Sequence, residues 1–316
     1  MYKKIIFITS LLLFFGCSSH SAYALPLSKW MENNGKLKVL STTAIIDNVV
    51  AEIGGEEIDH IPLIVGEIDP HSYELVKGDA EKLYFAELIF SNGLGLEHGA
   101  SLQAVLKNQD NVVALGNSLS KEDLIEMNHI YDPHFWMDAG LMSKVIPLVV
   151  KALSEKKPEF ADVFKSRGKR YQEELLDLDK RVLSIIESIP EKRRYLVTSH
   201  DAFNYFSRRY LSLEADDFEE RFKAPEGLAP DGQISTHHIQ EILDHLKVHN
   251  IETLFPESNV SRDSIKKIIS SGKRLGLSIK IAEEPLYGDA LGPKGSYIGM
   301  LEYNAEVIEK NLGKDS

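Results

Sequence analysis

Three histidines and one aspartate stand where the chain could hold a metal ion. The tripeptide Asp-Pro-His occurs twice, ending at His71 and at His134, and an aromatic residue follows each copy within two positions. Proline restricts its own φ and disfavours helix at the residue before it, so each histidine should emerge from a stiff turn. His200 follows a short apolar run, and Asp289 lies in a Gly-Asp-Ala segment. Three imidazoles and one carboxylate are a suitable tetrahedral donor set for a divalent transition metal.

The elements around these residues alternate between strand and helix in the first part of the chain. Apolar runs predict strands at 37–43, 61–65, 88–91 and 111–115, with helical stretches at 45–53 and 81–87 between them. This alternation predicts a parallel sheet, and the ligands of such sheets gather beyond the carboxyl ends of the strands. His71 follows the strand at 61–65 and is therefore placed as this rule requires.

Long helices follow His134. Residues 139–154 are apolar with helical spacing, and a second segment from Pro158 to Ile189 has apolar residues every three or four positions. A helix of about thirty residues is roughly 45 Å long, enough to run the height of two lobes. A second α/β lobe is then predicted, with strands at 195–198, 253–255 and 277–282 and helices at 202–210, 237–248, 264–275 and 297–312.

The first residues are typical of an export signal. Two lysines precede a nearly continuous apolar run from Ile5 to Phe15, which is too short to cross a bilayer as a mature helix. The run ends beside Cys17, the single cysteine of the chain, in a segment that resembles a bacterial lipobox except for Phe14, where leucine is usual. With Cys17 as a lipid anchor, any metal must be held by nitrogen and oxygen. The alternative is a plain secreted protein in which this cysteine has no such role.

The chain has 316 residues, a length that favours two domains over one. The predictions above divide it into five segments. Residues 1–16 are the predicted signal peptide, 17–36 a lipid-anchored tether, 37–154 the N-terminal α/β lobe, 155–190 the long linking helix and 191–316 the C-terminal α/β lobe.

Charge and spacing exclude two other classes of protein. The net charge of −12, with no basic run that carries interleaved aromatics, excludes nucleic acid as a partner. No His-Glu-x-x-His motif is present, so the sequence does not support a zinc protease. The intervals between the three histidines (134 − 71 = 63 and 200 − 134 = 66) fit no local metal motif. Spacing alone therefore does not separate them from the other histidines, which are interpreted as surface or structural residues.

Longer segments around the same residues resemble the solute-binding proteins of zinc/manganese-type ABC transporters, the cluster A-I metal receptors. The matching segments follow the family's order over nearly all of the mature chain, at 69–74, 86–97, 132–137, 197–206 and 286–291. The resemblance implies two α/β lobes, each with a mainly parallel sheet flanked by helices, joined by one long rigid helix. It also implies a metal buried between the lobes and held by His71, His134, His200 and Asp289, with Glu257 in a supporting position beside them.

The donor set favours zinc over manganese, which prefers more oxygen ligands and a higher coordination number. Similar manganese binders tend to carry glutamate where His200 stands, and this also favours zinc. Manganese and iron(II) are the alternatives, because related three-histidine sites are associated with both.

The function implied by the resemblance is that of an exported, monomeric receptor that captures a metal ion and delivers it to an ABC permease. The receptor would lie in the periplasm or at the outer face of the cytoplasmic membrane. An enzyme is not expected, because four protein ligands would close the open coordination position that a catalytic zinc needs. The competing hypotheses are a zinc hydrolase, for which no separate general base is apparent, a receptor for a chelated metal or vitamin, and an adhesin.

Overall fold

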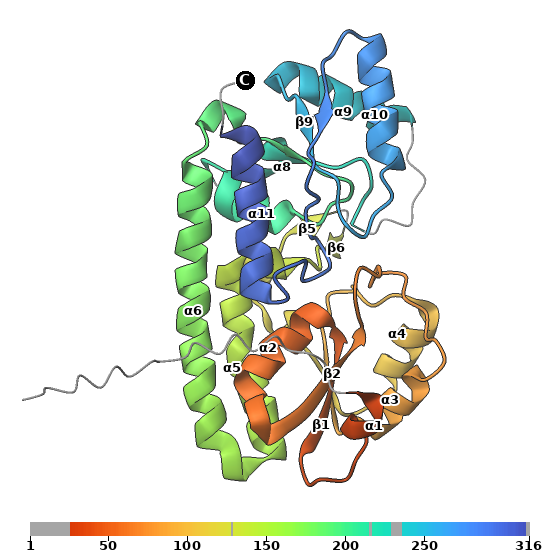
Figure 1. The fold of residues 1–316 in the computed structure, drawn as a ribbon, viewed down its shortest axis with the longest axis vertical. Helices are drawn as coiled ribbons and strands as arrows, with labels where there is room; N and C mark the ends of the chain where they lie inside the picture. The colour runs from red at the N-terminus through yellow and green to blue at the C-terminus, as the bar shows by residue number, and fades with distance from the viewer. Residues whose placement is uncertain (1–25, 128, 215–216, 229–235, 314–316) are drawn as a thin grey trace, which may run out of the picture.

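The computed structural model describes residues 26–313 except 128, 215–216 and 229–235. The predicted signal peptide and Cys17 lie outside the described residues. The described chain forms two lobes, one above the other in Figure 1, and one long helix, α6 (Ala161–Glu187), runs alongside both. Within the described ranges, no helix has the length and apolar character needed to cross a membrane.

The N-terminal lobe is built on a four-stranded parallel sheet. Its strands are β1 (Leu37–Thr43), β2 (Ile58–Ile64), β3 (Leu88–Ser91) and β4 (Val112–Ala114), in the order β2-β1-β3-β4. All seven residues of β1 are buried, as expected of a central strand that is covered on both faces. The flanking helices are α2 (Ala44–Gly54), α3 (Asp79–Phe85) and α4 (Ala100–Lys107).

Capping side chains explain where several helices begin. The hydroxyl of Thr43 accepts a hydrogen bond from the N–H of Ile46 at the start of α2. Asp138 does the same for α5 (Ala139–Lys156), and Ser296 for α11 (Tyr297–Leu312). Each cap satisfies a backbone N–H that has no partner inside its own helix.

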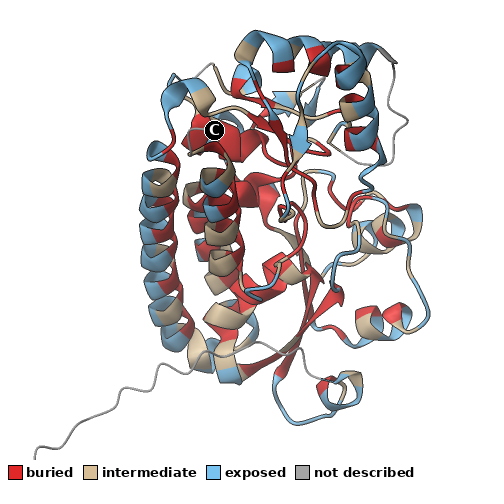
Figure 2. Ribbon diagram, turned by 45° about the horizontal axis from the view of Figure 1, so that its top comes forward, coloured by how far each residue is buried: buried red, intermediate tan, exposed pale blue. Residues whose placement is uncertain are grey.

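Helices α5 and α6 pack along each other beside the lobes. Most of the buried residues of α6 recur every three or four positions: Phe164, Gly168, Tyr171, Leu175, Leu178, Val182 and Ile186. Figure 2 shows the result, a helix with one buried and one exposed face. The 27 residues of α6 span about 40 Å. The largest apolar cluster contains Val39 of β1, Tyr171 of α6 and Ile308 of α11, so the two lobes share one core along this helix.

The C-terminal lobe has shorter strands. β7 (Leu196–Val197) pairs in parallel with β8 (Phe222–Lys223), and β9 (Thr253–Leu254) pairs in parallel with β10 (Lys280–Ile281). A hydrogen bond from the N–H of Phe255 to the carbonyl of Val197 joins the two pairs. The helices of this lobe are α8 (Phe218–Arg221), α9 (Thr236–His249), α10 (Asp263–Arg274) and α11. The predicted fold class, two mainly parallel α/β lobes with one long helix, is confirmed.

Some predicted elements differ in length or type. The strand predicted at 277–282 narrows to β10, and the helix predicted at 202–210 is α7 (Asn204–Phe206) followed by a π-helix at Ser207–Leu211. Four further elements were not predicted from the sequence: α4, α8 and an antiparallel pair, β5 (Glu126–Met127) with β6 (Ile130–Tyr131). These elements are short and partly exposed, so they leave little periodic apolar signal.

The last part of the predicted tether is packed against the N-terminal lobe. Leu27–Trp30 form a short helix, α1, and the side chain of Trp30 is fully buried. Its indole N–H donates to the carbonyl of Asp59 at 3.0 Å. The chain from Pro26 onward therefore belongs to the lobe, because one buried aromatic side chain fixes it there.

Candidate metal centre

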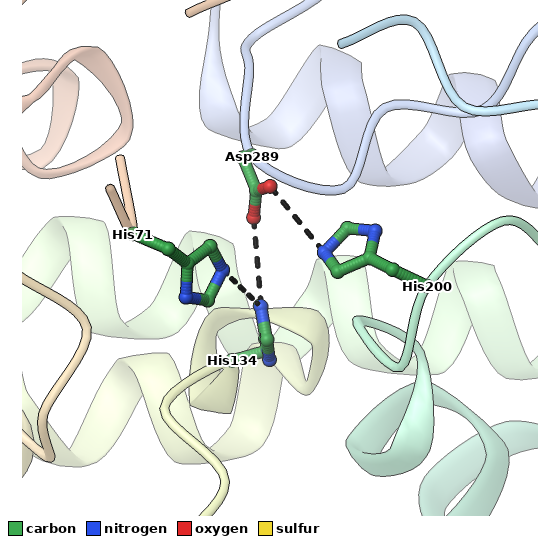
Figure 3. Close-up of side chains that lie close together, drawn as sticks. All are labelled: His71, His134, His200 and Asp289. Atoms are coloured by element: carbon green, nitrogen blue, oxygen red, sulfur yellow. Dashed lines mark hydrogen bonds and ion pairs between the residues drawn. The ribbon is translucent and has the colours of Figure 1, made fainter. Parts of the chain in front are cut away.

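The four predicted ligands lie together between segments of the two lobes (Figure 3). His71 lies in the loop after β2, His134 immediately before a 3-10 helix (Phe135–Met137), His200 shortly after β7, and Asp289 between β10 and α11. One donor atom from each residue lies within 4.8 Å of the donor atoms of the other three. Two of the four follow parallel strands at their carboxyl ends, where ligand sites of such sheets form.

Three of the distances between donor atoms are close to those around a tetrahedral metal ion. The Nε2 atoms of His71 and His134 are 3.1 Å apart. The two carboxylate oxygens of Asp289 lie 3.6 Å from Nε2 of His134 and 3.4 Å from Nε2 of His200. An ion with bonds of about 2.0 Å to nitrogen in tetrahedral geometry separates its ligand atoms by about 3.3 Å. These three distances bracket this value, and one donor atom of each residue lies within 4.8 Å of the other three, so the cluster has the size of such a site.

All four side chains are buried, with exposed fractions between 0 and 6%. Burial of an ionised carboxylate is costly unless a cation or hydrogen bonds compensate its charge. Within the described structure, Oδ1 of Asp289 has no hydrogen-bond partner, although it faces the imidazole of His134. A carboxylate oxygen in this position is a donor suited to a cation.

The two Asp-Pro-His segments build the same turn and then differ. In each, the aspartate accepts a hydrogen bond from the backbone N–H of the histidine at 2.8 Å. Oδ1 of Asp132 also lies 2.7 Å from Nδ1 of His134. The second oxygen of Asp69 instead accepts the hydroxyl of Ser72 at 2.6 Å. Asp132 therefore orients the ring of His134, whereas Asp69 holds the backbone that carries His71.

Residues of the C-terminal lobe hold Asp132 in turn. Asn204 donates from its side-chain amide to Oδ2 of Asp132 at 3.0 Å, and Tyr205 donates its hydroxyl to the carbonyl of Asp132 at 2.9 Å. Both partners belong to α7, which begins four residues after His200. The segment that carries His134 is thereby fixed to the segment that carries His200.

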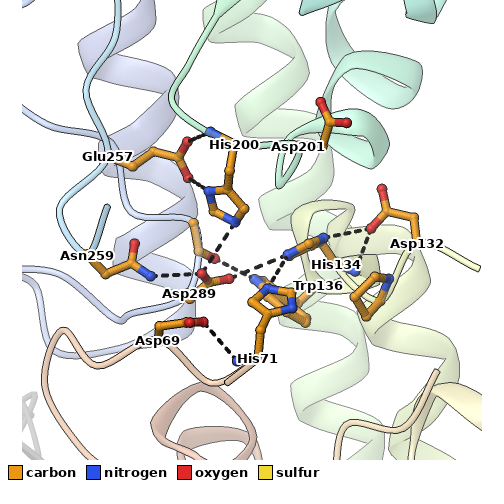
Figure 4. A network of polar contacts seen from close by, with 12 residues as sticks. Asp69, His71, Asp132, His134, Trp136, His200, Asp201, Glu257, Asn259 and Asp289 are labelled. Atoms are coloured by element: carbon orange, nitrogen blue, oxygen red, sulfur yellow. Dashed lines mark hydrogen bonds and ion pairs between the residues drawn. The ribbon is translucent and has the colours of Figure 1, made fainter. Parts of the chain in front are cut away.

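Glu257 lies beside His200 (Figure 4). One carboxylate oxygen accepts the backbone N–H groups of Ser199 and His200, at 3.0 and 2.8 Å. The other oxygen lies 2.7 Å from Nδ1 of His200. Asp132 and Glu257 thus each place a carboxylate at Nδ1 of a histidine, which favours the proton on Nδ1 and leaves the lone pair of Nε2 toward the centre.

The charges of the site shift its pKa values in opposite directions. Burial lowers the pKa of His71 well below its usual value. Burial also disfavours a charged His200, but the nearby carboxylates of Glu257 and Asp289 outweigh it and raise the pKa of His200 well above its usual value. Burial alone would raise the pKa of Asp289, but attraction to His200 outweighs it and lowers that pKa. These shifts favour a protonated His200 beside an ionised Asp289 when the site holds no metal.

Three further residues at the site were not identified from the sequence as its partners: Asp132, Asn259 and Trp136. The amide of Asn259 donates to Oδ2 of Asp289 at 2.8 Å. The indole N–H of Trp136 donates to the carbonyl of Gly288 at 2.8 Å. Asp132 could have been found from its place two residues before His134, since both Asp-Pro-His segments use the aspartate. No local signal could have identified Asn259 or Trp136, because their partners are distant in the sequence.

Several other histidines have partners of their own outside this cluster. Nδ1 of His60 lies 3.0 Å from the carboxylate of Asp47, and Nε2 of His249 lies 3.3 Å from that of Glu220. The ring of His98 lies 5.8 Å from the ring of His71, between centroids, and its Nδ1 faces the carbonyl of Gly95. The structure does not bring these residues into the group of four.

Comparisons with known proteins agree with this geometry. Residues 39–311 match the family described as zinc-uptake complex component A, periplasmic. The metal-binding protein YtgA of Chlamydia trachomatis is 37% identical over 87% of this chain and 86% of its own length. The manganese-binding lipoprotein MntA of Bacillus subtilis is 33% identical over 88% and 90% of the two chains.

Solved structures show the same architecture. The crystal structure of Fe(III)-bound YtgA from Chlamydia trachomatis superposes with a TM-score of 0.82 at 36% identity, over 87% of this chain and 97% of that one. The periplasmic zinc-binding protein TroA from Treponema pallidum superposes with a TM-score of 0.80 at 29% identity, over 87% and 99%. The family match and these relatives together cover most of the described chain. The protein therefore belongs to the zinc-uptake component A family of periplasmic metal-binding proteins.

Proposed function

We propose that this protein is the extracytoplasmic solute-binding component of an ABC transporter and that it captures a divalent transition metal with His71, His134, His200 and Asp289. The observation that carries this proposal is the convergence of four buried donor side chains from four separate segments of the chain. Membership of a periplasmic metal-uptake family supports the receptor role.

Zinc is the cargo that the donor set favours. Three imidazole nitrogens and one carboxylate are typical of tetrahedral zinc, whereas manganese prefers more oxygen ligands. Two of the imidazoles are held by carboxylates at Nδ1, which is the usual way of orienting histidine ligands of zinc. The relatives are named for zinc, manganese and Fe(III), so manganese and iron are the competing cargoes to be tested at the same site.

A receptor fits this site better than an enzyme. A catalytic zinc keeps one coordination position for water or substrate, and here four buried side chains would occupy all four positions. The protein would hand its metal to an ABC permease in the cytoplasmic membrane. It would act as an exported monomer in the periplasm or at the outer face of that membrane, with Cys17 as its lipid anchor.

Competitive metal titration of the chelator-treated mature protein tests the proposal. We expect the wild-type protein to bind one equivalent of zinc tightly, and to bind it in preference to manganese and iron(II). His200→Ala should lose tight binding, because it removes one of four ligands and takes away the imidazole beside the second oxygen of Glu257. His237→Ala is the matched control, since that histidine is mostly exposed on α9 and should leave the stoichiometry unchanged.

The other outcomes separate the site from its cargo. If the wild-type protein binds manganese or iron(II) tightly and His200→Ala abolishes this binding, the receptor function is supported and the cargo is that metal instead of zinc. If the wild-type protein binds no stoichiometric metal, the proposed function is refuted, although the fold is unaffected by this result.

A further inference from the structure

Trp136 occupies a position that joins two of the proposed ligands. It lies two residues after His134 in the 3-10 helix, and it is 3% exposed. Its ring meets the ring of His134 edge to face, with centroids 5.1 Å apart. The indole N–H donates to the carbonyl of Gly288, the residue before Asp289 (Figure 4). The side chain of Trp136 thus contacts both His134 and the backbone of the residue that precedes Asp289.

Trp136 holds the Asp289 segment at a second point. Its backbone carbonyl accepts the hydroxyl of Tyr297 at 2.6 Å. Gly288 and Tyr297 lie on either side of Asp289, at the two ends of the segment that leads into α11. Tyr297 is further held by its N–H, which donates to the side chain of Asn48 on α2 at 2.8 Å. The path of residues 288–297 is therefore set from the opposite lobe.

Gly288 has no free space around it. A Cβ added there would lie 2.6 Å from the carboxylate of Glu257 and 3.3 Å from the imidazole of His200. The backbone of Gly288 consequently packs directly against the pair formed by these two residues. A shift of this peptide would move Asp289 relative to His200, whose Nε2 lies 3.4 Å from its carboxylate.

The C-terminal lobe supplies the remaining contacts of the same segment. Asn259 donates to the carboxylate of Asp289, and the side-chain amide of Asn304 pairs with both the N–H and the carbonyl of Tyr287. These contacts would move together with the lobe. The hydrogen bond from Trp136 instead crosses between the lobes, so it would have to break if Asp289 withdrew from His71 and His134.

We propose that Trp136 is a positioning residue for metal retention: its indole N–H holds the carbonyl of Gly288, fixes Asp289 over the three imidazoles and thereby slows metal release. This inference rests on the proposed function of the same site. Trp136 acts through Asp289 and is not itself a ligand.

The test compares the same substitution, tryptophan to phenylalanine, at two positions. Trp136→Phe removes the indole N–H and keeps an aromatic side chain. Trp30→Phe is the matched control, because the chain has two tryptophans and Trp30 is also buried and also donates its N–H to a backbone carbonyl. Zinc dissociation is measured by stopped-flow mixing of the loaded mature protein with excess chelator. We expect dissociation about tenfold faster in Trp136→Phe, the effect of losing one buried hydrogen bond. Trp30→Phe should match the wild type.

A second measurement asks whether the effect passes through Asp289. In an Asp289→Asn background, which lacks the carboxylate ligand and should bind zinc more weakly, the zinc dissociation constant is measured by equilibrium titration. Adding Trp136→Phe should leave this constant unchanged within about twofold, because the carboxylate that Trp136 positions is already gone. Replacing Trp136 with benzothienylalanine, which keeps the bicyclic shape and lacks the N–H, should reproduce the faster release. This analogue also decides the question if Trp136→Phe folds poorly.

Each result has one meaning. Wild-type release rates in Trp136→Phe and in the analogue, with one equivalent of metal still bound, would overturn this inference alone. Equal acceleration in Trp30→Phe would also overturn it, because the effect would then be general loosening. A tenfold additional effect in the Asp289→Asn background would exclude action through Asp289. A wild-type protein that binds no metal would refute the proposed function, and this inference with it.

Discussion

His134 and His200 come from different lobes, and each has a carboxylate beside Nδ1 of its ring. Asp132 and Glu257 each place a carboxylate oxygen 2.7 Å from Nδ1, and each also accepts the backbone N–H of the histidine that it orients. Each carboxylate therefore holds the backbone of its histidine and places a negative charge beside the ring. This arrangement leaves Nε2 of both rings free to face the centre, and it reduces the conformational freedom that metal binding would otherwise have to remove.

The protonation of His200 predicts how metal affinity depends on pH. The carboxylates of Glu257 and Asp289 raise the pKa of His200, so at and below neutral pH the metal-free protein holds a proton there. Because the metal must displace this proton, affinity should fall by about tenfold for each unit of pH below that raised pKa. Burial keeps the pKa of His71 low, so protons should compete with the metal for His71 only at more acidic pH.

Zinc dissociation constants measured from pH 8 to pH 5 check this prediction. Glu257→Gln is the informative variant, since it removes one charge that stabilises protonated His200 while keeping an acceptor near Nδ1. The fall in affinity should then begin at lower pH. An affinity that stays flat from pH 8 to pH 5 in the wild-type protein would contradict the assignment of imidazole ligands.

At the scale of elements, α6 stabilises the arrangement of the lobes through one buried face. Leu175 on that face is fully buried, and its neighbour Leu176 on the opposite face is 46% exposed. We expect Leu175→Ala to lower the free energy of unfolding by ~2–5 kcal/mol, because it removes buried apolar surface and leaves a cavity. Leu176→Ala should change it by about 0.5 kcal/mol or less.

Urea unfolding of the metal-free protein measures both losses. Both variants should still bind one equivalent of metal, since neither side chain contacts the site residues. Equal destabilisation by the two substitutions would mean that the buried face of α6 does not carry the packing between the lobes.

At the scale of the whole molecule, the two lobes are parts of one packed body. A single apolar cluster runs from β1 through α6 to α11, and hydrogen bonds from Trp136, Tyr205 and Tyr297 cross between the lobes beside the site. Separating the lobes widely would break this core. Release of a metal is therefore expected to need local movement of segments that carry ligands, with the rest of the two lobes still packed.

The proposed lipid anchor concerns the whole molecule as well, because it decides where the receptor acts. Cys17→Ser should remove the anchor and move the protein from the membrane fraction to the soluble extracytoplasmic fraction, while leaving metal stoichiometry at one. Fractionation of cells that produce the two forms measures this. A variant that remains with the membrane would refute anchoring through Cys17.

The long elements were predicted from the sequence, and the same sequence named the four candidate ligands. Apolar residues every three or four positions predicted α6, and Pro158 marked where it follows α5, because both signals act within a few residues. The four candidate ligands were found partly from local turns and strands and partly from resemblance to a family. The short strands of the C-terminal lobe and the π-helix after α7 were predicted less well, since their hydrogen bonds depend on neighbours outside the segment.

Only the tertiary structure decided how the site is held. The two Asp-Pro-His segments are identical in sequence, yet Asp132 reaches the imidazole and Asp69 does not, because Asn204 and Tyr205 from the other lobe hold Asp132 in place. The bond from Trp136 to Gly288 joins residues 152 positions apart. Sequence periodicity records which face of an element is buried, but the partner of a buried polar group is set by packing between distant segments.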